Sequence, residues 1–174
     1  SENSFSETVS YVCDDFFCML DEGEGASLAK RDRTDVGVGR LPASTEAEAK
    51  VMVDKIIDYA TNAHAGDWQN TLCFMGDDGN NNVHMREADA AVQTVVSEHP
   101  SFNIRKGYWD AYQLTSSSVG KRYPDVERML RQQMQQGALI MDYCGHGSPY
   151  TISHERVLNL SDFSAATSLR LPLW

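Results

Sequence analysis

The order of apolar segments constrains the fold of this chain more than any other feature of its sequence. Strand-like apolar runs lie at 71–75, at 103–109 and from residue 138 onward. Between them, apolar residues recur at helical spacing: Ala88, Val92, Val95 and Val96 before Pro100, and Val126, Met129, Leu130 and Gln133 between Pro124 and Gly137. This alternation predicts an α/β fold with a mostly parallel sheet and helices on both faces.

An earlier helix is expected near residue 45, because Thr45 and Glu48 have the spacing of a capping box. Its apolar residues predict that one face packs on a sheet: Ala49, Met52, Val53, Ile56, Ile57 and Ala60. Residues 9–20 and 35–42 have the pattern of short strands, which predicts a small β-hairpin before this helix. We therefore expect N-terminal strands and a loop over 1–42, and an α/β core over 43–174.

Charge and composition narrow the classes of partner. The net charge is −10, from 15 basic and 25 acidic residues, so the surface repels phosphate backbones and nucleic acid is not expected as a partner. No apolar run approaches the length of a membrane span. The four cysteines lie at no metal-like spacing, and no cofactor is expected.

The apolar run from residue 138 ends at His146, which stands between two glycines. Glycine lacks a Cβ, so another reactive group can approach the imidazole closely. A histidine at the end of a strand can serve as a general base in α/β enzymes. Asp77 and Asp78 follow the run at 71–75. Because active groups in parallel sheets gather at the carboxyl ends of the strands, both loops are expected to supply the chemistry.

The pattern of an apolar strand, Gly-His-Gly-Ser and a second apolar strand resembles the gingipain-type cysteine peptidases of family C25, in the caspase-like clan. Four segments fit this family in the same order: 36–42, 59–73, 142–148 and 171–174. The loop at 76–79 and the Leu-Pro-Leu-Trp segment at 171–174 are most similar to the type IX secretion sortase of Bacteroidetes. The resemblance implies a caspase- or gingipain-like three-layer sandwich, preceded by the small β-hairpin.

The function that the resemblance implies is a cysteine endopeptidase acting on secreted proteins at the cell or outer-membrane surface, by hydrolysis or transpeptidation. Its partners would be protein or peptide substrates. Relatives also bind calcium, and the loop at 76–82 offers Asp and Asn oxygens, although without EF-hand spacing. A preference for arginine or lysine is not carried over, because 82–86 lacks the acidic specificity residue of the arginine-specific gingipains.

The resemblance also implies roles for individual residues. His146 would be the general base that takes the proton of a cysteine thiol, and the backbone N–H of Gly147 would help to form an oxyanion hole. Asp78 falls where the family carries an acidic residue that holds the other imidazole nitrogen, although the neighbouring Asp77 leaves this assignment open. His84 is either a residue of the substrate pocket or an exposed histidine in the first turn of a helix.

The nucleophile is the largest departure from the family pattern. The family's cysteine follows the final strand by a few residues, so it is expected beyond Trp174, and the 174-residue chain by itself is expected to be inactive. Cys144 lies on the same strand end as His146 and is not expected to face the imidazole. Ser148 has no better support as a nucleophile.

Alternatives to an active peptidase stay open at the level of sequence. One is a catalytically inactive, peptidase-like binding domain of a surface or secretion assembly. Another is a metal site built from His146, Asp77 and Asp78, but no second histidine is placed to join them, so no metal is expected. The strand-like segment at 171–174 also predicts dimerisation or strand exchange through an unpaired edge.

Overall fold

The computed structural model describes residues 14–25, 32–118 and 120–174. The chain divides into two compact units, Ser1–Ile57 and Asp58–Trp174, while the boundary expected at 42/43 stays a prediction. Among the described residues, no helix combines the length and the apolarity that crossing a membrane requires.

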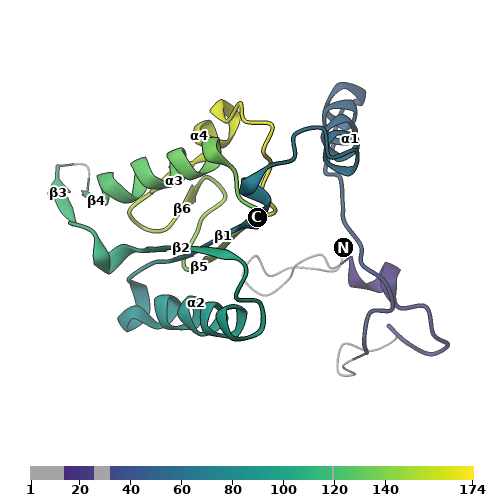
Figure 1. Cartoon of the computed structure of the whole chain (residues 1–174), viewed down its shortest axis with the longest axis horizontal. Coiled ribbons are helices and arrows are strands. Elements are labelled where there is room, and N and C mark those ends of the chain that lie inside the picture. The colour runs from purple at the N-terminus through teal and green to yellow at the C-terminus, as the bar shows by residue number, and fades with distance from the viewer. Residues whose placement is uncertain (1–13, 26–31, 119) are drawn as a thin grey trace, which may run out of the picture. The chain divides into compact units, whose positions relative to one another are not determined.

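The first unit contains the 3-10 helix η1 (Asp15–Cys18) and the start of helix α1 (Glu46–Ala60), drawn in purple and blue in Figure 1. The predicted capping box is confirmed: Glu48 N–H donates to Thr45 Oγ1 at 3.2 Å, and Thr45 N–H donates to Glu48 Oε2 at 3.0 Å. These bonds define the start of α1 because they satisfy N–H groups with no partner inside the helix. No residue of α1 is buried, so the packing of its apolar face stays a prediction.

The β-hairpin expected in this unit is not found in its described part. Residues 9–13 lie outside the described residues, the next segment forms η1, and 35–42 contain no strand. Asp35 N–H donates to the Cys18 carbonyl at 2.8 Å, but the Asp35 carboxylate also accepts the backbone N–H of Leu20 at 2.8 Å. Such side-chain bonds to the backbone compete with a strand ladder, which explains the loop found here.

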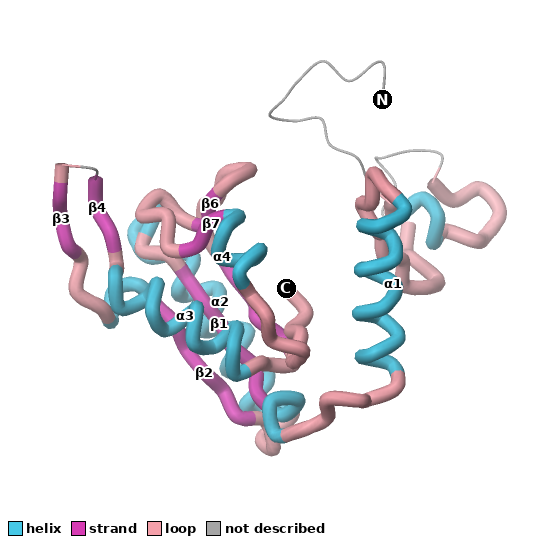
Figure 2. Tube along the Cα trace, turned by 90° about the horizontal axis from the view of Figure 1, so that it is seen from above, coloured by secondary structure: helices cyan, strands magenta, loops and turns pink. Residues whose placement is uncertain are grey.

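A parallel sheet of order β2-β1-β5 forms the centre of the second unit (Figures 1 and 2). Its strands are β1 (Thr71–Gly76), β2 (Asn103–Tyr108) and β5 (Ile140–Cys144). On the other side of β5, Leu173 forms a parallel bridge to Ile140 through backbone hydrogen bonds of 2.8 and 3.0 Å. The predicted parallel sheet is therefore confirmed. Self-association through its edge stays a prediction.

Helices cover this sheet from two sides, which is why β1 is apolar along its length (Figure 1). Cys73 and Met75 belong to a cluster that includes side chains of helix α3 (Pro124–Gln136). Leu72 and Phe74 point to the opposite face, toward helix α2 (Gly79–Glu98), because successive side chains of a strand alternate. The layered α/β architecture is the one that the sequence predicted.

Shorter elements complete the second unit. They are the hairpins β3 (Thr115–Ser117) with β4 (Gly120–Arg122) and β6 (Thr151–Ile152) with β7 (Leu158–Asn159), helix α4 (Leu160–Ala165), and the 3-10 helices η2 (Asp67–Asn70) and η3 (Trp109–Ala111). The serine-rich segment between η3 and α3 contains the β3–β4 hairpin. α3 begins at Pro124 and is followed by Gly137 at φ 86°, as the sequence predicted.

Candidate active site

His146 lies at the carboxyl edge of the sheet, just after the end of β5. The end of β1 is beside it, because Gly76 pairs with Cys144 in the register of the two strands. The backbone N–H of Asp77 continues this ladder by donating to the Cys144 carbonyl at 3.3 Å. The register therefore brings the histidine after one strand next to the carboxylate after the other, at one edge of the sheet.

Asp77 is the carboxylate that contacts His146, and its side chain is only 2% exposed. Its Oδ2 accepts the His146 backbone N–H at 2.6 Å and the Tyr143 hydroxyl at 3.2 Å, and lies 3.2 Å from His146 Nδ1. Its Oδ1 accepts the Gly79 N–H at 3.0 Å. Burial alone would raise the pKa of Asp77, but these hydrogen bonds favour the charged form and hold the pKa below its usual value. Asp77 is thus a fixed, ionised acceptor.

The contact with Asp77 sets the tautomer of the His146 ring. With Nδ1 against a carboxylate, the proton of the neutral imidazole belongs on Nδ1 and the lone pair on Nε2. Nε2 lies 3.4 Å from the amide nitrogen of Asn80, a donor that matches this assignment. A Cβ on Gly79 would lie 2.7 Å from two atoms of the ring, so glycine at that position lets the imidazole approach. In its neutral form the ring therefore directs its lone pair away from Asp77.

Asp78, the residue expected to hold the imidazole, is instead engaged on another element. Its Oδ2 accepts the hydroxyl of Tyr123 at 2.7 Å, and Tyr123 directly precedes α3. Asp77 still belongs to the ladder that joins β1 to β5, so the next side chain leaves in a different direction. The carboxylate beside His146 is therefore Asp77, the alternative that the sequence left open.

His84 is not an isolated surface residue. Its side chain is 17% exposed, and its ring meets the His146 ring edge to face, with centroids 4.9 Å apart. Its Nε2 lies 3.3 Å from the Asn80 amide nitrogen and 3.8 Å from Asp77 Oδ1. The residues before it explain this position, because Asn80, Asn81 and Asn82 adopt left-handed φ values of 52°, 56° and 61°. Asparagine tolerates that conformation better than other residues with a Cβ, so the three-asparagine run was an available sequence signal.

Three further residues of the site were not singled out from the sequence. The Tyr143 hydroxyl donates to the His146 carbonyl at 2.7 Å as well as contacting Asp77. Strand alternation could have found it, because Tyr143 shares a face of β5 with the buried Met141. The ring of His154 stacks on that of His146, with centroids 4.7 Å apart, and Asn80 contacts the rings of His84 and His146. The His154 contact has no signal in local sequence.

Gly147, expected as an oxyanion donor, lies between two backbone hydrogen bonds of the turn that follows β5. Ser153 N–H donates to the His146 carbonyl at 2.8 Å, and Ser148 N–H donates to the Thr151 carbonyl at 2.9 Å. Neither bond uses the N–H of Gly147, and no other hydrogen bond within the described residues engages it. The residue is exposed, so this N–H is accessible to a ligand beside the imidazole.

Cys144 is poorly placed and poorly activated as a nucleophile. Its thiol donates to Glu87 Oε2 at 3.3 Å and lies 3.8 Å from His84 Nδ1, on the side of His84 away from Asp77. Burial, together with the Glu87 carboxylate, raises the pKa of the thiol to about 11. Ser148 is also engaged locally, since its hydroxyl accepts two backbone N–H groups at 3.1 and 3.2 Å.

Groups that could hold a metal occur in both units. One consists of Asp77, His84 and His146, whose ligand atoms all lie within 4.8 Å of one another. A second combines His84 with Glu87 and Cys144, and the third is an acidic group in the first unit: Asp21, Glu24 and Asp35. The metal set considered from the sequence thus differs in one member, because His84 takes the place expected for Asp78.

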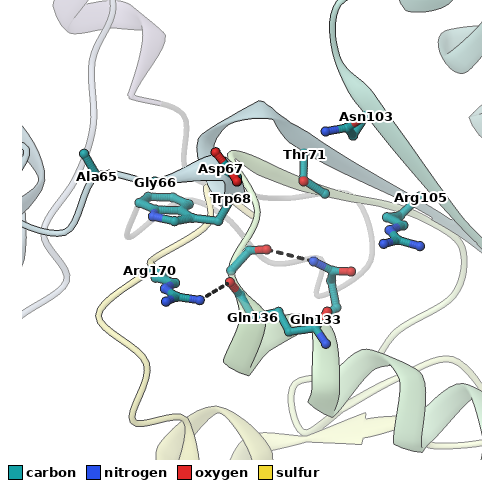
Figure 3. Close-up of a pocket in the computed structure, with 11 residues that line it drawn as sticks. Ala65, Gly66, Asp67, Trp68, Thr71, Asn103, Arg105, Gln133, Gln136 and Arg170 are labelled. Carbon is teal, nitrogen blue, oxygen red and sulfur yellow. Dashed lines mark hydrogen bonds between the residues drawn. The ribbon is translucent and has the colours of Figure 1, made fainter.

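A cavity of about 330 Å³ lies at the opposite, amino edge of the sheet. Figure 3 shows that Arg105 and Arg170 line it from different sides, and that Arg170 reaches the backbone carbonyl of Gln136 at 3.3 Å. Trp68 of η2 and Thr71, the first residue of β1, complete part of the wall. The cavity is therefore separate from the edge that carries His146.

Comparison with known proteins identifies the family. The model of peptidase family C25 matches residues 2–174, which include every residue of the site. No curated protein and no solved structure matches the chain. The matched span, the parallel sheet and the histidine at its carboxyl edge agree with the resemblance found in the sequence. The chain belongs to peptidase family C25, a family of cysteine peptidases.

Proposed function

We propose that this chain supplies the general-base half of a cysteine peptidase site. The observation that carries the proposal is the pair Asp77–His146, in which a buried, ionised carboxylate lies 3.2 Å from Nδ1 and leaves Nε2 as the basic atom. A histidine held in this way by a carboxylate is the arrangement needed to activate a thiol. The free N–H of Gly147 beside it supports an oxyanion site.

In the proposed reaction, Nε2 of His146 takes the proton of a cysteine thiol, and the thiolate attacks the carbonyl carbon of a peptide bond. Asp77 stabilises the imidazolium that forms, and the N–H of Gly147 donates to the developing oxyanion. The imidazolium then protonates the leaving amine, which leaves a thioester. Attack by water completes hydrolysis, whereas attack by an amine completes transpeptidation.

The thiol is proposed to come from the chain that continues beyond the Leu173 bridge to β5. Leu173 pairs with Ile140, and Cys144 and His146 lie four and six residues after Ile140. Parallel strands advance together at roughly 3.3 Å per residue. A side chain roughly four to six residues after Leu173 would therefore be level with the imidazole, which supports a nucleophile that follows Trp174 closely.

The finer proposal is that the substrates are secreted proteins processed at the cell surface, as in the type IX secretion sortase. It is supported by the sequence similarity of the loop at 76–79 and of the segment at 171–174. Mass analysis of products separates the two outcomes, because transfer to an added amine increases the product mass by that of the amine less water, relative to hydrolysis.

The test uses a polypeptide that continues past Trp174 through the next cysteine. We expect it to cleave fluorogenic peptides from a mixed library, with loss of activity after iodoacetamide treatment and a fall of at least about 10²-fold in His146→Ala. His99→Ala, at the end of α2, is the matched control and should retain activity. Cys144→Ser should also retain it. An extended polypeptide with no turnover would favour the inactive binding domain. Activity that survives His146→Ala would refute His146 as the general base.

A further inference from the structure

The His84 ring lies beside the His146 ring, in addition to the stacked ring of His154, although a peptidase base requires one imidazole. Nε2 of His84 and Nε2 of His146 lie 3.3 and 3.4 Å from the same amide nitrogen, that of Asn80. An amide N–H₂ group only donates, so each contact directs a nitrogen lone pair toward it. His84 therefore presents a basic nitrogen at Nε2 while its Nδ1 faces the thiol of Cys144, 3.8 Å away.

A carboxylate completes this group. Nε2 of His84 lies 3.8 Å from Asp77 Oδ1, and Nδ1 of His146 lies 3.2 Å from Asp77 Oδ2. In a tetrahedral zinc site with bonds of about 2.0–2.2 Å, ligand atoms are about 3.4 Å apart. These two separations, each to a different oxygen of Asp77, bracket that value, and one ligand atom from each of the three residues lies within 4.8 Å of the others. Side-chain rotation that brings one Asp77 oxygen toward both imidazoles would complete a shared site. The three residues come from the end of β1, from α2 and from the end of β5, which are packed elements.

We propose that Asp77, His84 and His146 form a binding site for one late divalent transition metal, with Zn²⁺ as the first choice. Two imidazoles and one carboxylate match the donor preference of zinc, whereas calcium and magnesium take oxygen ligands. Three protein ligands leave a fourth position for water. The His146 side chain is 32% exposed, so the ion has access from solvent.

Metal binding would switch off the base. An ion on Nδ1 of His146 takes the place of the proton that Nδ1 shares with Asp77. The neutral imidazole then carries its proton on Nε2, so the lone pair that accepts the thiol proton is lost. On His84, coordination at Nε2 leaves Nδ1–H for the Cys144 sulfur, the kind of outer contact that fixes a ligating histidine. This inhibition rests on the proposed function; the binding of the metal does not.

The second metal group of the unit, formed by His84, Glu87 and Cys144, is the competing assignment. Both groups use His84, but through different ring nitrogens. Asp77 is nearly fully buried and Glu87 is exposed, so the Asp77 group is the more rigid of the two. A thiolate ligand also has a distinct spectroscopic signature, which makes the two assignments separable.

Cobalt titration of the metal-free chain tests the binding. We expect one Co²⁺ per chain, visible absorption of a tetrahedral site, no thiolate-to-cobalt charge-transfer band, and displacement by Zn²⁺. His84→Gln and His146→Gln should each weaken binding by at least about 10-fold, and near-ultraviolet circular dichroism checks that both variants fold. Glu87→Gln is the matched control and should bind as the parent does. Cys144→Ser, whose hydroxyl can still accept from His84 Nδ1–H, should weaken binding less than either histidine variant. A charge-transfer band lost in Cys144→Ser, binding unaffected by His146→Gln, or no binding at all would overturn the proposal.

Inhibition is measured separately, on the extended polypeptide. Zn²⁺ should inhibit it and EDTA should restore its rate. With each rate expressed relative to the uninhibited rate of the same polypeptide, His84→Gln should need at least about 10-fold more zinc than the parent for the same fractional inhibition. Active enzyme with no metal binding refutes the metal site and leaves the peptidase proposal intact. Metal binding by a chain whose extended form has no activity refutes the peptidase proposal and leaves the metal site intact.

Discussion

Asp77→Asn replaces an ionised acceptor by a group of the same shape that has one acceptor oxygen and one donor nitrogen. The carboxylate now receives or shares four hydrogen bonds: those with His146 N–H, His146 Nδ1, Tyr143 O–H and Gly79 N–H. If the amide oxygen takes the Oδ2 position, the amide nitrogen faces the Gly79 N–H, donor against donor. The reverse orientation sets the nitrogen against the His146 N–H and the Tyr143 hydroxyl, which is worse.

The loss of free energy of unfolding follows from these contacts. A hydrogen bond to a charged group contributes about 1.5–3 kcal/mol, and a buried donor left without a partner costs about 1–3 kcal/mol. One lost bond, together with weaker charge assistance in the others, gives about 2–4 kcal/mol for Asp77→Asn. Asp78→Asn is the matched control. Among the described residues, the Asp78 carboxylate accepts a single hydrogen bond, from the Tyr123 hydroxyl at 2.7 Å. An amide oxygen can still accept it, so we expect a loss of about 0.5–1 kcal/mol.

Urea unfolding followed by tryptophan fluorescence measures both variants. Trp68, Trp109 and Trp174 all belong to the second unit, and Trp109 is fully buried against the Tyr143 ring, with centroids 5.9 Å apart. With a slope of about 2 kcal/mol/M, Asp77→Asn should lower the urea midpoint by about 1–2 M. Equal midpoints for the two variants, or a larger loss in Asp78→Asn, would refute the assignment of Asp77 as the buried carboxylate of the site.

Three further outcomes are expected. The pKa of Asp77 is lower in the folded chain than in the unfolded one. Its contribution to the free energy of unfolding is therefore complete above the usual carboxyl pKa and is lost as the pH falls through the lowered value. The difference in urea midpoint between the parent and Asp77→Asn should shrink below about pH 4. Gly79→Ala should displace the His146 ring, because two ring atoms would lie 2.7 Å from the new Cβ, and the His146 proton resonances should shift in NMR spectra. In Gly147→Ala the atom nearest to the new Cβ is 3.6 Å away, so the His146 resonances should stay nearly unchanged. The Cys144 thiol should react with iodoacetamide much more slowly at pH 8 than an unperturbed thiol, because its pKa is raised to about 11; labelling of that residue at the ordinary rate would contradict the environment described for it.

The layered sheet was predictable because its signal is local. β1 was expected at 71–75 and spans Thr71–Gly76. A strand that is apolar along its whole length is stable in such a fold only where helices cover both faces of the sheet. The N-terminal hairpin failed for the opposite reason. Val36 and Val38 alternate as strand residues do, but they remain about half-exposed, at 50% and 47%, and their segment has no ladder partner among the described residues. Alternation alone does not supply a partner.

The site was predictable as a place but not as a set of contacts. The glycines around His146 located the base, and the rule for parallel strands located the carboxylates at the same edge. The choice between Asp77 and Asp78 depended on where the β1–β5 ladder ends, which no local pattern reports. His84 was ambiguous because its position depends on the left-handed backbone of the asparagines before it.

The Asp77 carboxylate connects the carboxyl ends of two neighbouring strands. Asp77 directly follows β1, and its carboxylate contacts both the backbone N–H and the ring of His146, which follows β5. Its mechanical effect is that the imidazole and its anchor cannot drift apart without bending the sheet. Any conformational change during a reaction cycle should therefore occur in the segment that carries the proposed cysteine and in the bound substrate. The carboxyl edge of the sheet should stay rigid throughout.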